Sequence, residues 1–180
     1  MTCRTSVVSA VLWLALAASA AAVPVHQNPS DSQLVEEVVR SVNAYPRLTI
    51  FDDINVHADG GDVTLTGKVT MPVKKNEIAQ RVSSIGGVKS VRNDIDVLPA
   101  SIPDDELRQR VARAIYGHSA FWRYAALPRP PIHIVVEDGR VTLTGVVDRE
   151  ADRTLARSLA AGQGGISVTN ALRTEGARVH

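Results

Sequence analysis

The clearest pattern in the sequence is a short run of alternating apolar and polar positions that occurs twice. Val63-Thr64-Leu65-Thr66-Gly67 returns as Val141-Thr142-Leu143-Thr144-Gly145, 78 positions later. Alternation and β-branched residues predict a strand at each copy. A second alternating run precedes each copy across a Gly-containing turn, which predicts β-hairpins over about 54–69 and 132–147. We therefore expect an internal duplication.

A helix is expected before each hairpin, because apolar residues recur there at every fourth position. The two stripes are Leu34, Val38 and Val42 in the first copy and Leu107, Val111 and Ile115 in the second. The first helix is expected to begin at Asp31 or Ser32 and to stop at Pro46. The second is expected to have Asp104 as its cap and Gly117 as a left-handed exit. These helices are offset by 73 positions, so the second copy has five extra residues before its hairpin.

A second helix and a closing strand are expected after each hairpin. The helices are predicted over about 73–85 and 149–161, each ended by glycines. We expect Leu155 and Leu159 to match Ile78 and Val82, an offset of 77, with one residue lost in the turn after the second strand. The closing strands alternate over Val91, Asn93, Ile95 and Val97 and over Val168, Asn170 and Leu172. The repeated asparagines are expected to bond neighbouring backbone.

The predicted fold class is α+β, with two tandem αββαβ units. Each unit is expected to be a small three-stranded mixed sheet with two helices packed on one face, the third strand running parallel to the second. The predicted segments are a signal peptide (1–22), a leader (23–30), a first domain (31–99), a linker (100–103), a second domain (104–175) and a tail (176–180). Val135 and Val146 fall on the outer sheet face of the second domain. We expect that face to be partly buried against the other unit or a partner, because units of about 70 residues are marginal alone.

Residues 1–22 predict export. Arg4, an apolar core and small residues before the cleavage position are typical of a signal peptide, and about a dozen apolar residues are too few for a span of roughly 20. Cleavage removes Cys3, the single cysteine, so the exported chain has no disulfide and no thiol chemistry. It also removes Arg4 from the 20 basic residues, which leaves 19 against 19 acidic. This balance argues against nucleic-acid binding by bulk charge. Periplasmic location is expected, with full secretion left open.

The aromatic residues cluster before the hairpins. The six outside the signal peptide are Tyr45, Phe51, Tyr116, Phe121, Trp122 and Tyr124. Aromatic rings beside arginines suit a lipid headgroup boundary, where one end is apolar and the other wet. The candidate lipid- or partner-binding residues are Phe121, Trp122, Arg123, Tyr124 and Arg129, with Arg110 and Arg113 on the preceding helix. In the alternative interpretation the rings fold inward and close the open end of the helix–sheet sandwich.

The order of these motifs resembles the BON domain of osmotically inducible and nodulation-related bacterial envelope proteins. The shared features are the helix, the Val-Thr-Leu-Thr-Gly strand after a Gly-containing turn, the helix ending in Gly86-Gly87 and the closing Val-x-Asn strand, in two copies over most of 31–175. The resemblance implies a non-enzymatic envelope module, often periplasmic, that binds phospholipid surfaces or envelope proteins. The longer connection in the second copy departs from the first, so contacts made there are expected to differ.

No residue set predicts catalysis, a metal site or a cofactor. The histidines His26, His57, His118, His133 and His180 have no ligand spacing supported by a carboxylate. Asp59 to Asp62 supplies turn residues rather than a calcium loop. The resemblance, together with the aromatic rings beside arginines, instead implies a protein that binds an anionic phospholipid surface and helps to maintain or protect the envelope. The alternative is a protein-binding adaptor or secretion-system module that uses its sheet edges and the outer face around Val135 and Val146.

Overall fold

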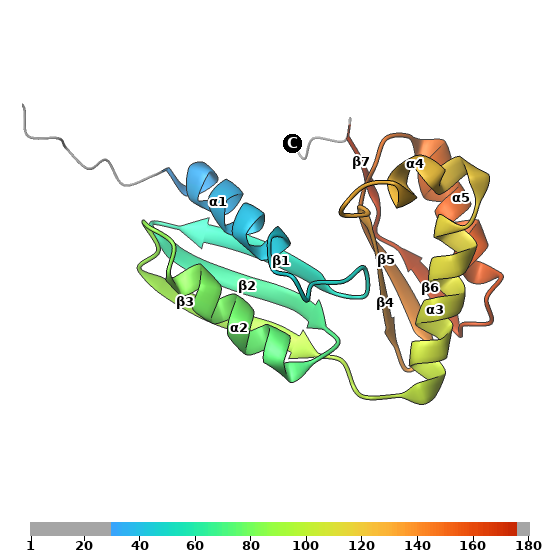
Figure 1. The fold of residues 1–180 in the computed structure, drawn as a ribbon, viewed down its shortest axis with the longest axis horizontal. Coiled ribbons are helices and arrows are strands. Elements are labelled where there is room, and N and C mark those ends of the chain that lie inside the picture. The colour runs from blue at the N-terminus through green and yellow to red at the C-terminus, as the bar shows by residue number, and fades with distance from the viewer. Residues whose placement is uncertain (1–29, 176–180) are drawn as a thin grey trace, which may run out of the picture.

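The computed structural model describes residues 30–175, which form two αββαβ units in sequence (Figure 1). Unit one contains α1 (Asp31–Asn43), β1 (Asp53–Asp59), β2 (Asp62–Val69), α2 (Pro72–Ser83) and β3 (Ser90–Val97). Unit two contains α3 (Ile102–Tyr116), η1 (Ser119–Phe121), α4 (Trp122–Ala125), β4 (Ile132–Glu137), β5 (Arg140–Val147), α5 (Glu150–Ala161), β6 (Ser167–Asn170) and β7 (Arg173–Thr174). The predicted α+β duplication is confirmed. The predicted signal peptide, nearly all of the leader and the tail lie outside the described residues.

Each unit has the predicted mixed sheet, covered by its helices on one face (Figure 1). β2 pairs antiparallel with β1 and parallel with β3, and β5 pairs antiparallel with β4 and parallel with β6. Unit two departs from three strands because β7 also pairs with β5. Leu143 opposes Asn170 and Val146 opposes Arg173, so β6 and β7 keep one register and are two parts of a single interrupted strand.

The repeated glycine of the duplicated strand has a steric reason. Gly67 and Gly145 have φ values of 118° and 110°, a backbone region that residues with a side chain rarely adopt. A Cβ at Gly67 would lie 2.1 Å from the carbonyl oxygen of Asp53, and one at Gly145 would lie 1.9 Å from that of Pro131. In each unit the backbone at the start of the preceding strand, or just before it, therefore passes too close for any side chain at this position.

The helix starts differ from the predictions. Ser30 caps α1 through a capping box with Gln33, and Ser101 caps α3. Asp104, predicted as the cap, is instead buried in the first turn, where its carboxylate accepts hydrogen bonds from the backbone nitrogens of Asp138 and Gly139 at 2.9 and 2.8 Å. Asp104 thus holds the β4–β5 turn against α3. The predicted left-handed exit is also wrong, because the φ of Gly117 is −82°.

The predicted offset of the second helices is wrong by one residue. The buried face of α5 consists of Asp152, Ala156 and Ala160, which match Lys74, Ile78 and Val82 of α2 at an offset of 78. Leu155 and Leu159 lie beside this face and are only partly buried. The hydrophobicity pattern did not indicate this face, because it consists of two small alanines and a charged residue. The hairpins and the second helices share the offset of 78, whereas the closing strands are offset by 77. The residue missing from unit two therefore lies between α5 and β6.

The repeated asparagines have the expected structural role. The side-chain nitrogen of Asn93 donates to the carbonyl oxygen of Lys75 at 3.0 Å, and that of Asn170 donates to the carbonyl oxygen of Arg153 at 2.9 Å. Each asparagine thus ties the closing strand to the first turn of the second helix.

The two units contact each other through residues 44–52, the segment between α1 and β1, here called connection one, and through Lys68 of β2. The backbone nitrogen of Ile134 on β4 donates to the carbonyl oxygen of Ile50 at 2.7 Å. Nδ1 of His133 lies 2.6 Å from the carbonyl oxygen of Asp52 and donates to it, since a carbonyl only accepts. Phe51 packs against the core of unit two, and Lys68 forms an ion pair with Glu137. Connection one therefore covers part of the free edge of β4.

The β4 edge receives further partners from within unit two. The hydroxyl of Tyr116 donates to the carbonyl oxygen of Ile132 at 2.6 Å and accepts from its backbone nitrogen at 3.0 Å, as a neighbouring strand would. Arg108 donates to the carbonyl oxygen of Val136 at 2.6 Å. These contacts protect an edge that would otherwise pair with other chains. The expected burial of the outer face is confirmed at Val135, which is buried, whereas Val146 stays 36% exposed.

Candidate functional site

The segment between α3 and β4, residues 117–131, contains most of the predicted site and is here called connection two. It folds into η1 and α4, which lie at one end of unit two (Figure 1). Phe121 and Tyr124 are buried in the core of unit two, with ring centroids 5.9 Å apart. These two rings fold inward and close the core, so in this conformation they are not available to a partner.

Arg123 is held by neighbouring side chains. Its guanidinium pairs with Asp152 and with Asp148, at 3.2 Å from the latter, and lies 4.6 Å from the ring centroid of Tyr124. The Tyr124 hydroxyl donates to Asp152 at 3.0 Å and accepts from the backbone nitrogen of Asp148 at 2.8 Å. Burial tends to raise the pKa of Asp152, but bonds from Arg149, Tyr124 and Arg123 outweigh it and hold that pKa below its usual value. Arg123 therefore fastens α4 to α5.

Unit one buries a related cluster with the charges exchanged. Lys74 occupies the position of Asp152, and its Nζ lies 2.6 Å from Oδ2 of Asp52 at the end of connection one. Both side chains are buried, and Asp52 also accepts bonds from Thr49 and Thr70. Burial alone would raise the pKa of Asp52, but Lys74 and the threonines hold it below its usual value. In both units an ion pair to a buried charge on the second helix thus fixes the connection.

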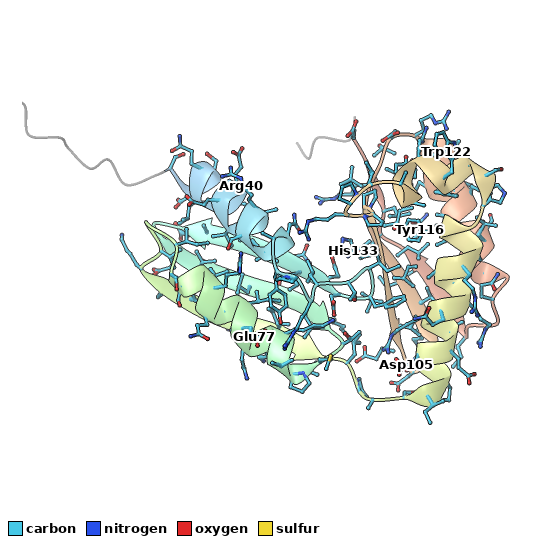
Figure 2. All side chains as sticks on the ribbon, in the orientation of Figure 1. Arg40, Glu77, Asp105, Tyr116, Trp122 and His133 are labelled. Carbon is cyan, nitrogen blue, oxygen red and sulfur yellow. The ribbon has the colours of Figure 1, made fainter. Side chains whose placement is uncertain are left out.

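The outer surface of connection two carries the remaining predicted residues. Trp122 is 70% exposed on the outer side of α4 (Figure 2), and Leu127, which the sequence did not single out, is 46% exposed. Arg129 and Arg113 are exposed, and neither forms an ion pair within residues 30–175. Arg110 instead contacts Glu106 at 3.8 Å and the carbonyl oxygen of Gln163 at 3.3 Å. Of the predicted residues, Trp122, Arg113 and Arg129 are therefore the ones whose side chains are exposed and form no ion pair within residues 30–175.

A cleft of about 810 Å³ lies where connection two faces unit one. Its polar side chains include Arg129, Arg173 and His133, and its apolar ones include Val39 and Val146. Sequence analysis missed Arg173 and the cleft position of His133. No local signal marks them, because the cleft exists only once the two units are docked.

The chain matches the BON domain family twice, over residues 30–99 and 103–176, and therefore belongs to this family. BON domains are in general non-enzymatic, bind membrane phospholipids and occur in periplasmic or envelope-associated proteins. The chain thus has an envelope-associated role.

Two solved structures resemble this chain. CdsD, a structural protein of the type III secretion system of Chlamydia trachomatis, is 16% identical with a TM-score of 0.27, covering 79% of this chain and 92% of that one. The C-terminal domain of CdsD is 14% identical with a TM-score of 0.28, covering 81% and 99%. Similarity at this level carries no inference about function. No curated protein gives a significant match.

Two further properties of residues 30–175 bear on membranes and metals. None of their helices combines the length and the apolar character that crossing a bilayer requires. Over the same range, no three His, Cys, Asp or Glu side chains gather closely enough to hold a metal ion.

Proposed function

We propose that this protein is exported to the periplasm and binds the surface of anionic phospholipid membranes through the outer surface of connection two, without catalysis. Through this contact it helps to maintain or protect the envelope. The observation that carries the proposal is the 70% exposure of Trp122 beside buried Phe121 and Tyr124. A large aromatic side chain left in water is unusual where its neighbours reach the core, and such residues favour the membrane interface.

The residues around Trp122 suit an anionic surface. Leu127 adds a second exposed apolar side chain on the same connection, and Arg113 and Arg129 supply cationic groups without ion-pair partners among residues 30–175. Arg123 and the buried rings hold α4 against α5 and the core of unit two. The backbone that carries Trp122 is therefore rigid. A rigid contact loses less conformational entropy on binding than a flexible loop does.

The expected affinity is modest. Burying Trp122 contributes roughly 1.5 to 3 kcal/mol, and each arginine near an anionic surface contributes about 1 kcal/mol. Together with Leu127, one molecule gains about 5 to 7 kcal/mol, which corresponds to dissociation constants of about 10 to 200 μM. Binding is therefore expected to be reversible and to weaken with salt.

The proposal is tested by flotation with vesicles. The unaltered chain should float with phosphatidylglycerol-containing vesicles and not with phosphatidylcholine vesicles, and Trp122→Ala should lower the floated fraction severalfold. The matched control is Ile102→Ala, because Ile102 is 76% exposed at the opposite end of α3. Equal losses for the two variants, or no loss for Trp122→Ala, would remove connection two from the contact.

Export is tested separately. N-terminal sequencing of protein recovered from a periplasmic extract should show cleavage within or just after residues 1–22. A chain that keeps Met1 and fractionates with the cytoplasm would contradict the proposed location.

The protein-binding alternative rests on the outer sheet face of unit two. Val135 is buried on this face, and Val146, which is 36% exposed, is the exposed apolar side chain there. Val146 alone is a smaller apolar contact than the core of a typical protein interface. Failure to float with any vesicle, combined with capture of a defined envelope protein that Val146→Ser abolishes, would support the alternative.

A further inference from the structure

We propose that the cleft between the two units binds the headgroup and the adjoining chain segment of one anionic phospholipid molecule, with its phosphate between Arg129 and Arg173. The inference rests on the proposed function, because contact with a membrane supplies the ligand. It goes beyond that function by adding a site for a single lipid, separate from the surface contact of Trp122.

The cleft is built from both units. Its floor is the outer face of unit two's sheet, with His133 on β4 and Thr144 on β5 opposite each other in register. One wall is α1 with connection one, and the other is the segment Pro128-Arg129-Pro130-Pro131. Figure 2 shows His133 between the two units, on the side of β4 that faces unit one. The prolines restrict the backbone of the second wall, so the cleft is largely formed before any ligand binds.

The charges around the cleft favour an anion. Arg129 and Arg173 line it, and neither forms an ion pair within residues 30–175. Five other arginines of unit two are paired with carboxylates, namely Arg108, Arg110, Arg123, Arg149 and Arg153. Asp53 is the one acidic residue in the lining. Two free guanidinium groups against one carboxylate suit a phosphate, which arginine can hold through paired hydrogen bonds.

Two polar groups on the floor of the cleft can bond a ligand. Oγ1 of Thr144 is buried and has no hydrogen-bond partner within the described residues. Nδ1 of His133 donates to the carbonyl oxygen of Asp52, which leaves Nε2 of the neutral ring to accept a hydrogen bond from a hydroxyl of the headgroup. A buried hydroxyl without a partner is unfavourable, and a polar headgroup in the cleft would satisfy it.

The lining of the cleft is apolar in one part and cationic in another. Val39 on α1 and Val146 on β5 are 39% and 36% exposed, and the partly buried Leu48 of connection one and Ile54 of β1 also line the cleft. A site of about 810 Å³ with cations and apolar side chains fits a molecule that is charged at one end and aliphatic at the other. It is of a size for a headgroup and a short length of chain, so the remaining hydrocarbon stays in the bilayer.

The same connection leads from the surface contact to the cleft. Connection two runs from Trp122 through Leu127 to Arg129, and in Figure 1 the segment after α4 extends toward unit one. A membrane held at Trp122 would therefore place lipid headgroups close to the arginines of the cleft.

The test uses lipid that forms no bilayer. The full chain is titrated by calorimetry with dihexanoyl phosphatidylglycerol below its micelle concentration, and separately with dihexanoyl phosphatidylcholine, glycerol 3-phosphate and inorganic phosphate. We expect one site for the phosphatidylglycerol. Arg173→Gln and Arg129→Gln should each weaken it by about tenfold or more, since each removes a charged hydrogen bond. The control Arg157→Gln, an exposed arginine on α5 outside the cleft, should leave the affinity within about twofold.

The outcomes separate this inference from the proposed function. Single-lipid binding lost in Arg173→Gln but kept in Trp122→Ala supports the cleft. No binding of the single lipid by a chain that floats with anionic vesicles overturns the cleft and leaves the surface contact standing. The reverse result, single-lipid binding without flotation, overturns the surface contact instead. Binding of inorganic phosphate as tight as that of the lipid contradicts the amphiphilic site, because the apolar walls would then contribute nothing.

Discussion

Connections one and two occupy the same place in the duplicated fold but differ in length and in role. Connection two is five residues longer by the alignment of the helices and hairpins. Connection one lies against β4 and inserts Phe51 beside the core of unit two, so it joins the units. Connection two covers its own core with Phe121 and Tyr124 and leaves Trp122 outside. In the duplicated scaffold, connection one thus joins the two units, and connection two leaves Trp122 exposed for the membrane contact that we propose.

The buried ion pairs sharpen this comparison. An ion pair joins the connection to the second helix in each unit, with the two charges exchanged. In unit one the acid Asp52 is on the connection and Lys74 on the helix, and in unit two Arg123 is on the connection and Asp152 on the helix. What both units retain is a pairing between opposite charges rather than a particular residue. Each connection is therefore fixed to the second helix of its own unit.

The largest expected effect is a difference in the free energy of unfolding between variants of two adjacent residues of connection two, Phe121 and Trp122. Phe121→Ala should lower the free energy of unfolding by about 4 kcal/mol, because it leaves a cavity in the core of unit two. Trp122→Ala should change it by less than about 0.5 kcal/mol, because the side chain is exposed. Urea denaturation followed by far-UV circular dichroism measures both. Similar losses for the two variants would contradict the inward and outward placement of the rings.

The second effect compares the fully buried ion pair of unit one with the partly exposed ion pairs of Asp152 in unit two. Asp52→Ala should lower the free energy of unfolding by about 3 kcal/mol, because it leaves the buried ammonium of Lys74 without its counter-charge. Asp152→Ala should lower it by about 1 to 2 kcal/mol, because Arg123 and Arg149 are partly exposed and water can solvate them. The same denaturation series ranks them. A larger loss for Asp152→Ala would reverse the comparison.

The third effect concerns the glycine shared by both hairpins. Gly145→Ala should lower the free energy of unfolding by about 2 to 3 kcal/mol, because its Cβ would collide with the carbonyl oxygen of Pro131. Gly67→Ala should behave in the same way in unit one. Gly86→Ala is the control, since a Cβ there meets nothing within 4 Å and its φ is not positive. It should change stability by less than about 0.5 kcal/mol. A tolerated Gly145→Ala would argue against the close approach of the two strands.

The smallest effect is the dependence of stability on pH. The pKa values of Asp52 and Asp152 are lower in the folded chain than in the unfolded one, where an aspartate has a pKa of roughly 3.9. Their contribution is therefore fully present above that value and is lost as the pH falls through the folded pKa. Thermal melting from pH 7 to pH 2 should show a plateau followed by a decline below about pH 4. Asp52→Asn should flatten the decline, and an unchanged slope would contradict the ion pair.

Sequence patterns predicted those parts of the molecule in which a periodic apolar stripe meets a sheet. The stripes Leu34-Val38-Val42 and Leu107-Val111-Ile115 are buried as predicted, and the repeated strands occupy the predicted places. The face of α5 was mistaken because alanines fill it and Leu155 is more hydrophobic than its buried neighbour Ala156. Hydrophobicity alone does not identify a buried face that is built from small residues.

The site was harder to predict for two physical reasons. Phe121, Trp122 and Tyr124 stand close together in irregular structure, where no period distinguishes an inward from an outward side chain. Which rings are buried depends on η1, α4 and the contacts of Arg123 with Asp152, which lies 29 positions away. The cleft depends on contacts between the units, such as that of His133 with Asp52, which no local pattern encodes.

The most direct test of the proposed membrane contact is the fluorescence of Trp122. In a Trp13→Phe variant of the chain Trp122 is the sole tryptophan, whether or not residues 1–22 are removed. Its emission should be that of a water-exposed indole in buffer, shift to shorter wavelength with phosphatidylglycerol-containing vesicles and return when salt is added. Phosphatidylcholine vesicles should cause no shift. An emission that stays unchanged while the protein binds anionic vesicles would contradict the account, because another surface would then make the contact.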